Sequence, residues 1–150
     1  MDLQLKGKTA LVSGASQGLG RAIAIGLAAE GVQVAITARR RELLENVAAE
    51  IVKQGGLKPV IIAADLYPEN ASDEIAAQAL KAMGRVDIVA NSAGGSRPLP
   101  LDGSKEAWLE GMTLNFWRLR ELTHALLPSM IEHQFGRVRS EEHTSELQSH

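Results

Sequence analysis

Leu11-Val12-Ser13-Gly14-Ala15-Ser16-Gln17-Gly18-Leu19-Gly20 is the stretch that decides the fold of this 150-residue chain. It joins an apolar run, residues 9–13, to an amphipathic run that begins near Gly18, which predicts a strand, a glycine turn and the start of a helix. Gly14 can adopt the positive φ of a tight turn, Gly18 lets a ligand approach the backbone, and Gly20 lets the helix pack closely on the strand. The free N–H groups of the first helical turn lie at the positive end of the helix dipole, so the turn predicts a pyrophosphate site.

The three glycines have the spacing G-x-x-x-G-x-G rather than the commoner G-x-G-x-x-G. This turn resembles the nucleotide-binding turn of the short-chain dehydrogenase/reductase family, which usually has Thr at the position of Ser13. A glycine-rich connection without a ligand is the alternative. The resemblance implies a Rossmann-type, doubly wound parallel α/β sheet that binds NAD(P). It also implies that the turn supplies cofactor contacts: Ser13, Gly14, Ser16, Gln17, Gly18, Leu19 and Gly20.

The same turn also matches G-x-S-x-G, the nucleophile elbow of serine hydrolases, with Ser16 as the nucleophile. That function needs an oxyanion loop from an earlier strand, yet only about a dozen residues precede the turn. It also needs an acid and then a histidine downstream, an order that Asp87 or Asp102 followed by His124 satisfies. Because His124 lies in a long helical pattern, we expect a nucleotide site rather than a hydrolase.

The composition is that of one globular domain, with 45% hydrophobic and 3% aromatic residues. Scarce aromatics predict a core of Ala, Val, Ile and Leu, which suits a parallel sheet covered by helices. The absence of cysteine excludes disulfides and thiolate metal sites. The sequence contains no signal core or apolar run of membrane-spanning length, and the formal net charge of −2 gives no basic field for nucleic acid. We therefore expect a cytoplasmic protein with no metal, membrane or nucleic-acid partner.

Apolar runs alternate with helical stripes along the chain, and this alternation predicts repeated strand–helix units. Strands are predicted at residues 9–13, 32–37, 60–64 and 86–90, with the start of a fifth at 136–138. Glycines end the first three helices, and a long helical pattern runs from Lys105 to about His133. The alternation thus predicts a parallel sheet of four strands and the start of a fifth, and the resemblance implies that this sheet is doubly wound and incomplete.

The end of the second predicted strand indicates which dinucleotide is bound. A fold that takes NAD offers an acidic residue there, whereas one that takes NADP offers an arginine to the 2′-phosphate. The residues are Thr37-Ala-Arg-Arg-Arg41, with no acid before Glu42. Arg39 is the expected clamp, because a guanidinium can hold phosphate in a bidentate fork. The alternative is that the arginines open a solvated helix. We expect NADP in preference to NAD.

Two further motifs resemble the family. Asp65-Leu66 follows the third strand and matches a dipeptide that lies beside the adenine ring, although an Asp after a strand is as often a turn former. Asn91-Ser92-Ala93-Gly94 resembles the family's Asn-Asn-Ala-Gly turn, with Ser92 in place of the second Asn. There Asn91 can bond neighbouring strand ends, while Ala93 and Gly94 let the backbone pass close to the cofactor ribose.

The long helical pattern carries one polar residue of interest, Asn115. It matches the Asn of the family's catalytic set, which implies that it holds a water in the proton relay; a plain polar helix residue is the alternative. The apolar stripe of this pattern is expected to be core or partner-helix contact. Its members are Trp108, Met112, Phe116, Leu119, Leu122, Leu126 and Met130. The resemblance implies a homodimer or homotetramer formed through this helix.

The resemblance covers residues 7–138 and then departs. In the family the fifth strand leads to a catalytic Ser and to Tyr-x-x-x-Lys, but here the one tyrosine is Tyr67 and no lysine follows Lys105. We therefore expect residues 1–138 to be the cofactor-binding part of an NADP-dependent oxidoreductase. Its substrate would be a carbonyl or secondary alcohol, as in the similar 3-oxoacyl-acyl carrier protein reductases, and the chain alone would have no turnover. A non-catalytic NADP(H)-binding or regulatory module is the alternative.

Residues 139–150 contain one apolar residue in twelve and are expected to be disordered. His143 and His150 lack fixed partners for a metal. The stretch resembles the translation of a sequencing-library adapter, and we expect it to be an artefact rather than a natural C-terminus. A sheet that ends at Val138 would expose apolar surface, which predicts poor solubility.

Overall fold

The computed structural model describes residues 1–95 and 102–141. Strands and helices alternate from the first strand to the fifth. Their bounds are β1 (Thr9–Ser13), α1 (Gly18–Ala29), β2 (Gln33–Ala38), α2 (Arg41–Lys53), β3 (Val60–Ala63), α3 (Ala71–Met83), β4 (Ile88–Asn91), α4 (Lys105–Met112), the π-helical segment η1 (Thr113–Trp117), α5 (Arg118–Glu132) and β5 (Arg137–Ser140).

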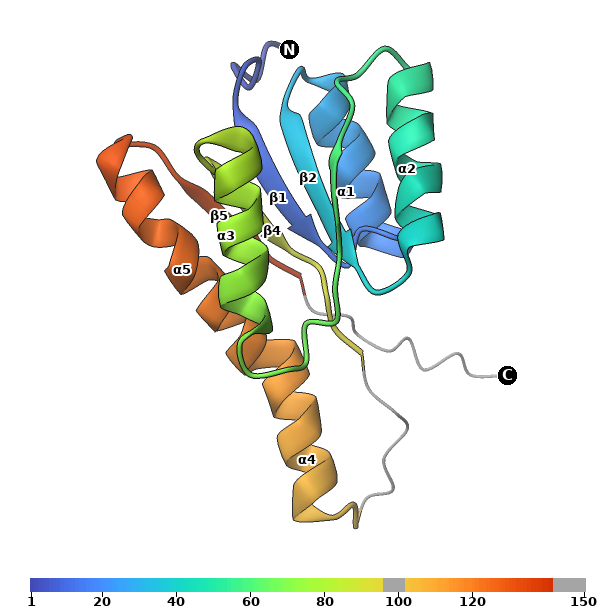
Figure 1. Cartoon of the computed structure of the whole chain (residues 1–150), viewed down its shortest axis with the longest axis vertical. Helices are drawn as coiled ribbons and strands as arrows, with labels where there is room; N and C mark the ends of the chain where they lie inside the picture. Colours follow the sequence, from blue (N-terminus) through green and yellow to red (C-terminus); the bar gives the residue numbers. More distant parts are fainter. Residues whose placement is uncertain (96–101, 142–150) are drawn as a thin grey trace.

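The five strands form one parallel sheet in the order β3-β2-β1-β4-β5. Helices α1 and α2 pack against one face, and α3 and α5 pack against the other (Figure 1). The strand order steps outward from β1 in both directions, which is the doubly wound arrangement. This confirms the predicted Rossmann-type fold.

The core consists of two layers, one on each face of the sheet, and its buried side chains are almost all Ala, Val, Ile and Leu. Strand β1 is buried along its whole length, because helices cover both of its faces. The fully buried large side chains include Leu11, Ile36, Ile75 and Leu122. No helix in the described ranges is long and apolar enough to cross a membrane.

The fifth strand is longer than predicted. Arg139 and Ser140, which we expected to begin a disordered tail, pair with Ala90 and Asn91 of β4. The backbone N–H of Glu141 also donates to the carbonyl of Asn91 at 3.0 Å. Ladder bonds of this kind use main-chain groups, so the open edge of β4 can pair with a polar segment. The rest of the predicted tail, residues 142–150, lies outside the described residues.

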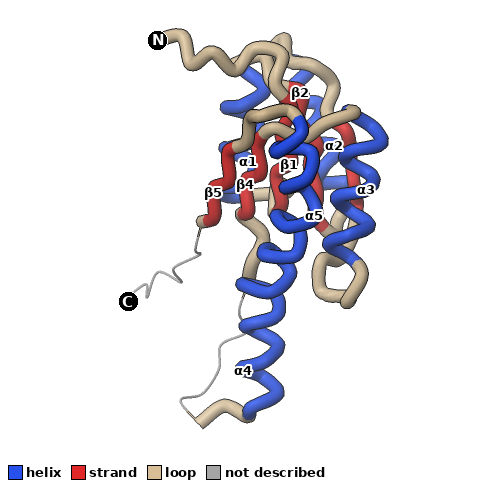
Figure 2. Tube along the Cα trace, turned by 90° about the vertical axis from the view of Figure 1, so that its left-hand side faces the viewer, coloured by secondary structure: helices blue, strands red, loops and turns tan. Residues whose placement is uncertain are grey.

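The predicted long helix is divided into α4, η1 and α5. In α5 the apolar stripe is buried against α3 and the sheet, whereas α4 has no buried residue and extends past the edge of the sheet (Figure 2). The stripe's first residues are therefore about half exposed: Trp108 by 57%, Met112 by 49% and Phe116 by 49%. From Leu119 onward the stripe is core, as one of the two predicted alternatives requires, and partner-helix contact by its first three residues stays a prediction.

Candidate functional site

A cleft of about 1220 Å³ opens at the carboxyl ends of the four strands β1 to β4. Four strand-to-helix loops and one side of α4 line it. The lining includes most of the cofactor-binding residues predicted from the sequence: Ser13, Gly14, Ser16, Gln17, Gly18, Leu19, Arg39, Asp65, Leu66, Ala93 and Gly94. Two other predicted residues, Gly20 and Asn91, lie behind this surface rather than in it. The topology thus brings segments far apart in sequence to one edge of the sheet.

The three glycines of the first turn have three different environments. Gly14 has φ +63°, and a Cβ there would lie 2.5 Å from the carbonyl oxygen of Ser92. Gly18 has φ +58°, and a Cβ there would meet no heavy atom of the described residues within 4 Å. A Cβ at Gly20 would lie 2.2 Å from the carbonyl oxygen of Gly14, because the helix packs closely on the turn. Gly18 alone faces open space, where a ligand can approach the backbone.

The N-terminus of α1, which follows this turn, suits an anion. Its N-cap residue, Gln17, makes no side-chain capping bond, and its first turn holds no acidic residue. By contrast, the first turns of α2, α3 and α4 all carry acidic side chains. The first N–H groups of a helix have no intrahelical partner, so those of α1 can bind a phosphate beside Gly18.

Ser13 connects the first turn to the loop after β4. Its hydroxyl oxygen accepts hydrogen bonds from the backbone N–H groups of Ser92 and Ala93, each at 3.1 Å. The hydroxyl also donates to the carbonyl of Ala90 at 3.5 Å. Ser13 is only 1% exposed. Its hydroxyl is therefore used to hold two walls of the cleft together.

Two arginines line the cleft at the end of β2. Arg39, which the sequence predicted, and Arg40 are both exposed, whereas Arg41 begins α2 outside the lining. The preceding Thr37 is only 3% exposed, and its buried hydroxyl has no hydrogen-bond partner among the described residues. Residues 33–40 include no Asp or Glu, so this segment has no carboxylate that would repel a phosphate. This end of the cleft suits a second anionic group.

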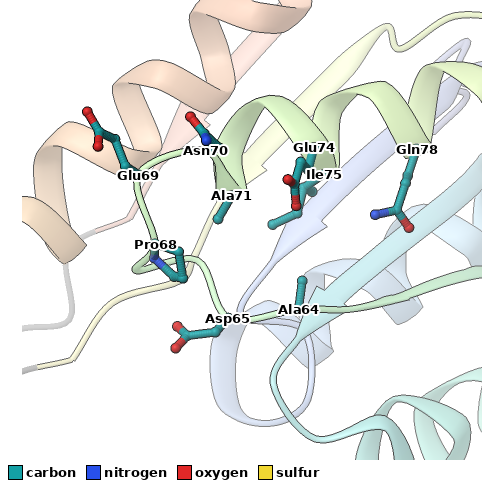
Figure 3. Close-up of a pocket in the computed structure, with 9 residues that line it drawn as sticks. All are labelled: Ala64, Asp65, Pro68, Glu69, Asn70, Ala71, Glu74, Ile75 and Gln78. Carbon is teal, nitrogen blue, oxygen red and sulfur yellow. The ribbon is translucent and has the colours of Figure 1, made fainter.

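The β3–α3 loop forms the next wall. The Asp65 carboxylate accepts a hydrogen bond from the backbone N–H of Tyr67 at 3.0 Å, so it shapes the turn as well as lining the cleft. A second hollow of about 360 Å³ lies between this loop and α3, and it shares Ala64 and Asp65 with the cleft (Figure 3). In Figure 3 the Asp65 carboxylate points away from α3.

The two asparagines singled out from the sequence act as links between segments. The side-chain N–H₂ of Asn91 donates to Thr123 of α5 at 2.9 Å and to Ser140 of β5 at 3.4 Å. Asn115 lies in η1, where its amide oxygen accepts from the N–H of Gly95 at 3.0 Å and its amide nitrogen donates to the Gly95 carbonyl at 2.9 Å. Asn91 thus joins strand ends, and Asn115 holds the loop after β4.

Several lining residues were missed by the sequence reasoning. They are Ala64, Tyr67 and, from α4 and η1, Ala107, Glu110, Gly111 and Leu114. Ala64 and Tyr67 flank a predicted dipeptide, so their place at a strand end could have identified them. The α4 and η1 residues follow no motif, and only the tertiary structure brings them to the cleft.

A hydrolase site is not assembled around Ser16. None of the residues that line the described cleft is a histidine, and His124 is exposed on α5. Asp87 lies at the amino ends of the strands, opposite the cleft, where its carboxylate binds Arg85 and the backbone N–H of Thr9. Burial by itself raises the pKa of Asp87, but hydrogen bonds from Arg85 and Thr9 and the Arg85 charge bring it below the ordinary value. Asp87 is therefore a structural anion.

Comparisons with known proteins agree with this geometry. Residues 8–139 match the model of the short chain dehydrogenase family. A short chain dehydrogenase of Pseudocercospora fijiensis is 40% identical over 140 residues, which cover 91% of this chain and 45% of that protein. A fatty acyl-CoA reductase of Acinetobacter baylyi is 37% identical over 137 residues, which cover 89% of this chain and 46% of that protein. The chain spans about half the length of these curated relatives.

Solved structures show the same similarity. A metagenomic short-chain oxidoreductase in complex with NADP superposes with a TM-score of 0.84 at 36% identity, over 91% of this chain and 62% of that one. A 7α-hydroxysteroid dehydrogenase complexed with NADH and 7-oxo glycochenodeoxycholic acid gives a TM-score of 0.87 at 29% identity, over 93% of this chain and 54% of that one.

Proposed function

The chain belongs to the short chain dehydrogenase family, a family of oxidoreductases, and on that premise we propose that its cleft binds NADP(H). A full-length protein that carries this domain would transfer hydride between the nicotinamide and a carbonyl or secondary alcohol. One observation carries the proposal. The uncapped N-terminus of α1 and the pair Arg39 and Arg40 line the same cleft, so it offers two anion sites.

Each part of the cofactor has a candidate set of residues. The pyrophosphate would lie over Gly18 and the first turn of α1, and Arg39 would hold the 2′-phosphate. The adenine would lie beside Asp65-Leu66, and the loop of Ala93 and Gly94 would approach the nicotinamide ribose. Ser13 and Asn91 would support these loops from behind through the hydrogen bonds described above.

The preference for NADP over NAD rests on the arginines at the end of β2. The solved relatives include complexes with NADP and with NADH, so family membership is compatible with both. A guanidinium can form a bidentate pair with a phosphate, whereas NAD offers only a ribose hydroxyl at that position. We therefore propose that NADP(H) is the preferred cofactor.

The substrate is proposed only as a class. Two of the four relatives named above are a fatty acyl-CoA reductase and a hydroxysteroid dehydrogenase, and both names imply a carbonyl or an alcohol. A substrate like that of the 3-oxoacyl-acyl carrier protein reductases stays a prediction. The chain itself contains no Tyr-x-x-x-Lys, so we expect it to bind NADP(H) without turnover. Asn115 is proposed to serve the proton relay of the complete enzyme.

We also propose self-association through α4 and η1. Five large apolar side chains are about half exposed there: Trp108, Leu109, Met112, Phe116 and Trp117. Such a group of apolar side chains is typical of a protein-binding surface. A second copy of the same helix would cover it and give a homodimer or homotetramer.

The cofactor preference can be tested with two matched arginine variants. Arg39→Ala removes the proposed phosphate clamp, and Arg41→Ala removes a neighbouring exposed arginine outside the cleft. We expect the Kd for NADP⁺ to rise at least about tenfold in Arg39→Ala, since a charge-assisted hydrogen bond contributes roughly 1.5–3 kcal/mol. The Kd for NAD⁺, and both constants in Arg41→Ala, would stay near those of the unmodified chain. Equal loss of both cofactors in Arg39→Ala would contradict the clamp.

A further inference from the structure

Arg118 lies at the junction of η1 and α5, and its side chain reaches the β3–α3 loop. The side chain is only 13% exposed, and its Nε donates to the backbone carbonyl of Tyr67 at 2.8 Å. An Nη1 hydrogen bond to Glu121 at 3.1 Å holds the guanidinium from the other side. The Arg118 carbonyl accepts a hydrogen bond from the Ser72 hydroxyl at 2.7 Å. The residue is therefore fixed between α5, α3 and the loop.

The contact with Tyr67 continues to the cleft. While the Tyr67 carbonyl accepts from Arg118, the Tyr67 N–H donates to the Asp65 carboxylate at 3.0 Å. Asp65, Leu66 and Tyr67 all line the cleft. The guanidinium and the carboxylate thus hold one loop residue from its two ends. A change in the Arg118 contact would alter the position of the Asp65 carboxylate.

The same helical junction also holds the neighbouring loop. Asn115, three residues before Arg118, forms two hydrogen bonds with the backbone of Gly95 in the loop after β4. Figure 1 shows the β3–α3 loop passing beside the helical junction. A π-helical segment shifts the helix phase relative to a continuous α-helix, and such segments are frequent at functional sites. One stretch of helix therefore holds two walls of the cleft.

We infer that Arg118 is a positioning residue for cofactor binding, which acts through the Tyr67 backbone to fix the Asp65 carboxylate at the adenine end of the cleft. This inference rests on the proposed NADP(H) site. Arg118 is thus a second residue of the helical junction, after Asn115, that holds a loop of the cleft, and no sequence motif marks it.

The test compares Arg118→Gln with Arg120→Gln, an exposed arginine two residues along the same helix. The probe is 2′,5′-ADP, which carries only the adenosine end of NADP, and it is titrated into the full chain by calorimetry. We expect Arg118→Gln to raise the Kd about tenfold, the value of one charge-assisted hydrogen bond, and Arg120→Gln to leave it unchanged. If the unmodified chain binds the probe and Arg118→Gln binds it equally well, the inference is wrong while the proposed function stands. If the unmodified chain does not bind, both are wrong.

A double-mutant cycle with Asp65→Ala separates positioning from simple bracing of the fold. If Arg118 acts through Asp65, Arg118→Gln changes the Kd by less than about twofold in the Asp65→Ala background, because coupled residues are not additive. If Arg118 only stabilised the fold, Arg118→Gln would change the Kd by the same factor in both backgrounds, or would lower the Tm without changing the Kd. Arg118→Lys keeps a cation near Glu121 and is measured alongside. It is expected to bind the probe with an intermediate Kd, and it provides the comparison if the glutamine variant does not fold.

Discussion

Alanine substitutions at the three glycines of the first turn are expected to separate folding from cofactor binding. Gly14 and Gly20 are close to neighbouring backbone, whereas Gly18 faces open space in the cleft. Gly26 lies in the C-terminal half of α1, where a Cβ would have no described neighbour within 4 Å, and it provides a matched control. The four variants differ by the same single methyl group, so their differences report the local environment.

The expected magnitudes follow from the backbone geometry. At Gly14 the positive φ costs about 1–2 kcal/mol for a residue with a Cβ, and displacing the Ser92 carbonyl adds roughly 1–3 kcal/mol. At Gly18 only the first cost applies. At Gly20 the Cβ would clash with the Gly14 carbonyl, a cost of about 1–3 kcal/mol that a helix-propensity gain near 1 kcal/mol partly offsets. Gly26→Ala has only that gain and is expected to stabilise the fold.

Urea unfolding and NADPH titration of each variant provide the assay. We expect Gly18→Ala to retain a folded domain, with a free energy of unfolding reduced by about 1–2 kcal/mol, but to lose at least about tenfold in NADPH affinity. Gly14→Ala is expected to be the least stable of the four. The reasoning is refuted if Gly18→Ala binds NADPH as well as Gly26→Ala does, or if Gly14→Ala is as stable as Gly18→Ala.

Three further predictions concern the loop contacts, the buried carboxylate and the exposed helix. Ser13→Ala leaves two backbone N–H groups without their acceptor and is expected to reduce the free energy of unfolding by roughly 2 kcal/mol in urea titrations, whereas Ser13→Thr retains the hydroxyl and most of the stability. The folded-state pKa of Asp87 lies below its ordinary value of 3.8, so the ionised carboxylate stabilises the fold above pH 3.8, and this stabilisation is lost as the pH falls through the folded-state pKa. Asp87→Asn is expected to remove this part of the acid dependence of Tm in melts recorded at different pH values. An unchanged loss of Tm at acid pH in Asp87→Asn would contradict the prediction. Met112→Asp places a charge in the exposed apolar group on α4 and is expected to shift sedimentation toward monomer, while an unchanged oligomer size would assign self-association to another surface.

The parts of the fold and site that could be predicted from sequence are those encoded locally. The glycine spacing, the strand before it and the amphipathic helix after it fix the first turn within a dozen residues. The positive φ of Gly14 and the close packing at Gly20 agree with the prediction, whereas the positive φ of Gly18 was not predicted. Arg39 could be placed at the cleft because parallel strands end at the same edge of the sheet. The alternation of strands and helices predicted a parallel sheet covered by helices, and the resemblance to the family implied its doubly wound order.

The remaining features depend on contacts between distant residues. Arg118 and Tyr67 are 51 positions apart, and neither lies in a recognisable motif. The half-exposed stripe of α4 has the same apolar periodicity as the buried stripe of α5, so the pattern alone could not distinguish a helix on the sheet from one that extends past it. The addition of Arg139 and Ser140 to β5 depends on backbone pairing with the open edge of β4, which their polar sequence does not indicate.

The central claim is that the cleft at the ends of β1 to β4 binds NADP(H), and a calorimetric titration of the chain with NADPH and with NADH tests it most directly. We predict saturable binding of one NADPH per chain, with a Kd at least about tenfold lower than that for NADH, as expected for one charge-assisted phosphate contact. A folded chain that binds neither nucleotide saturably at millimolar concentrations would contradict the account.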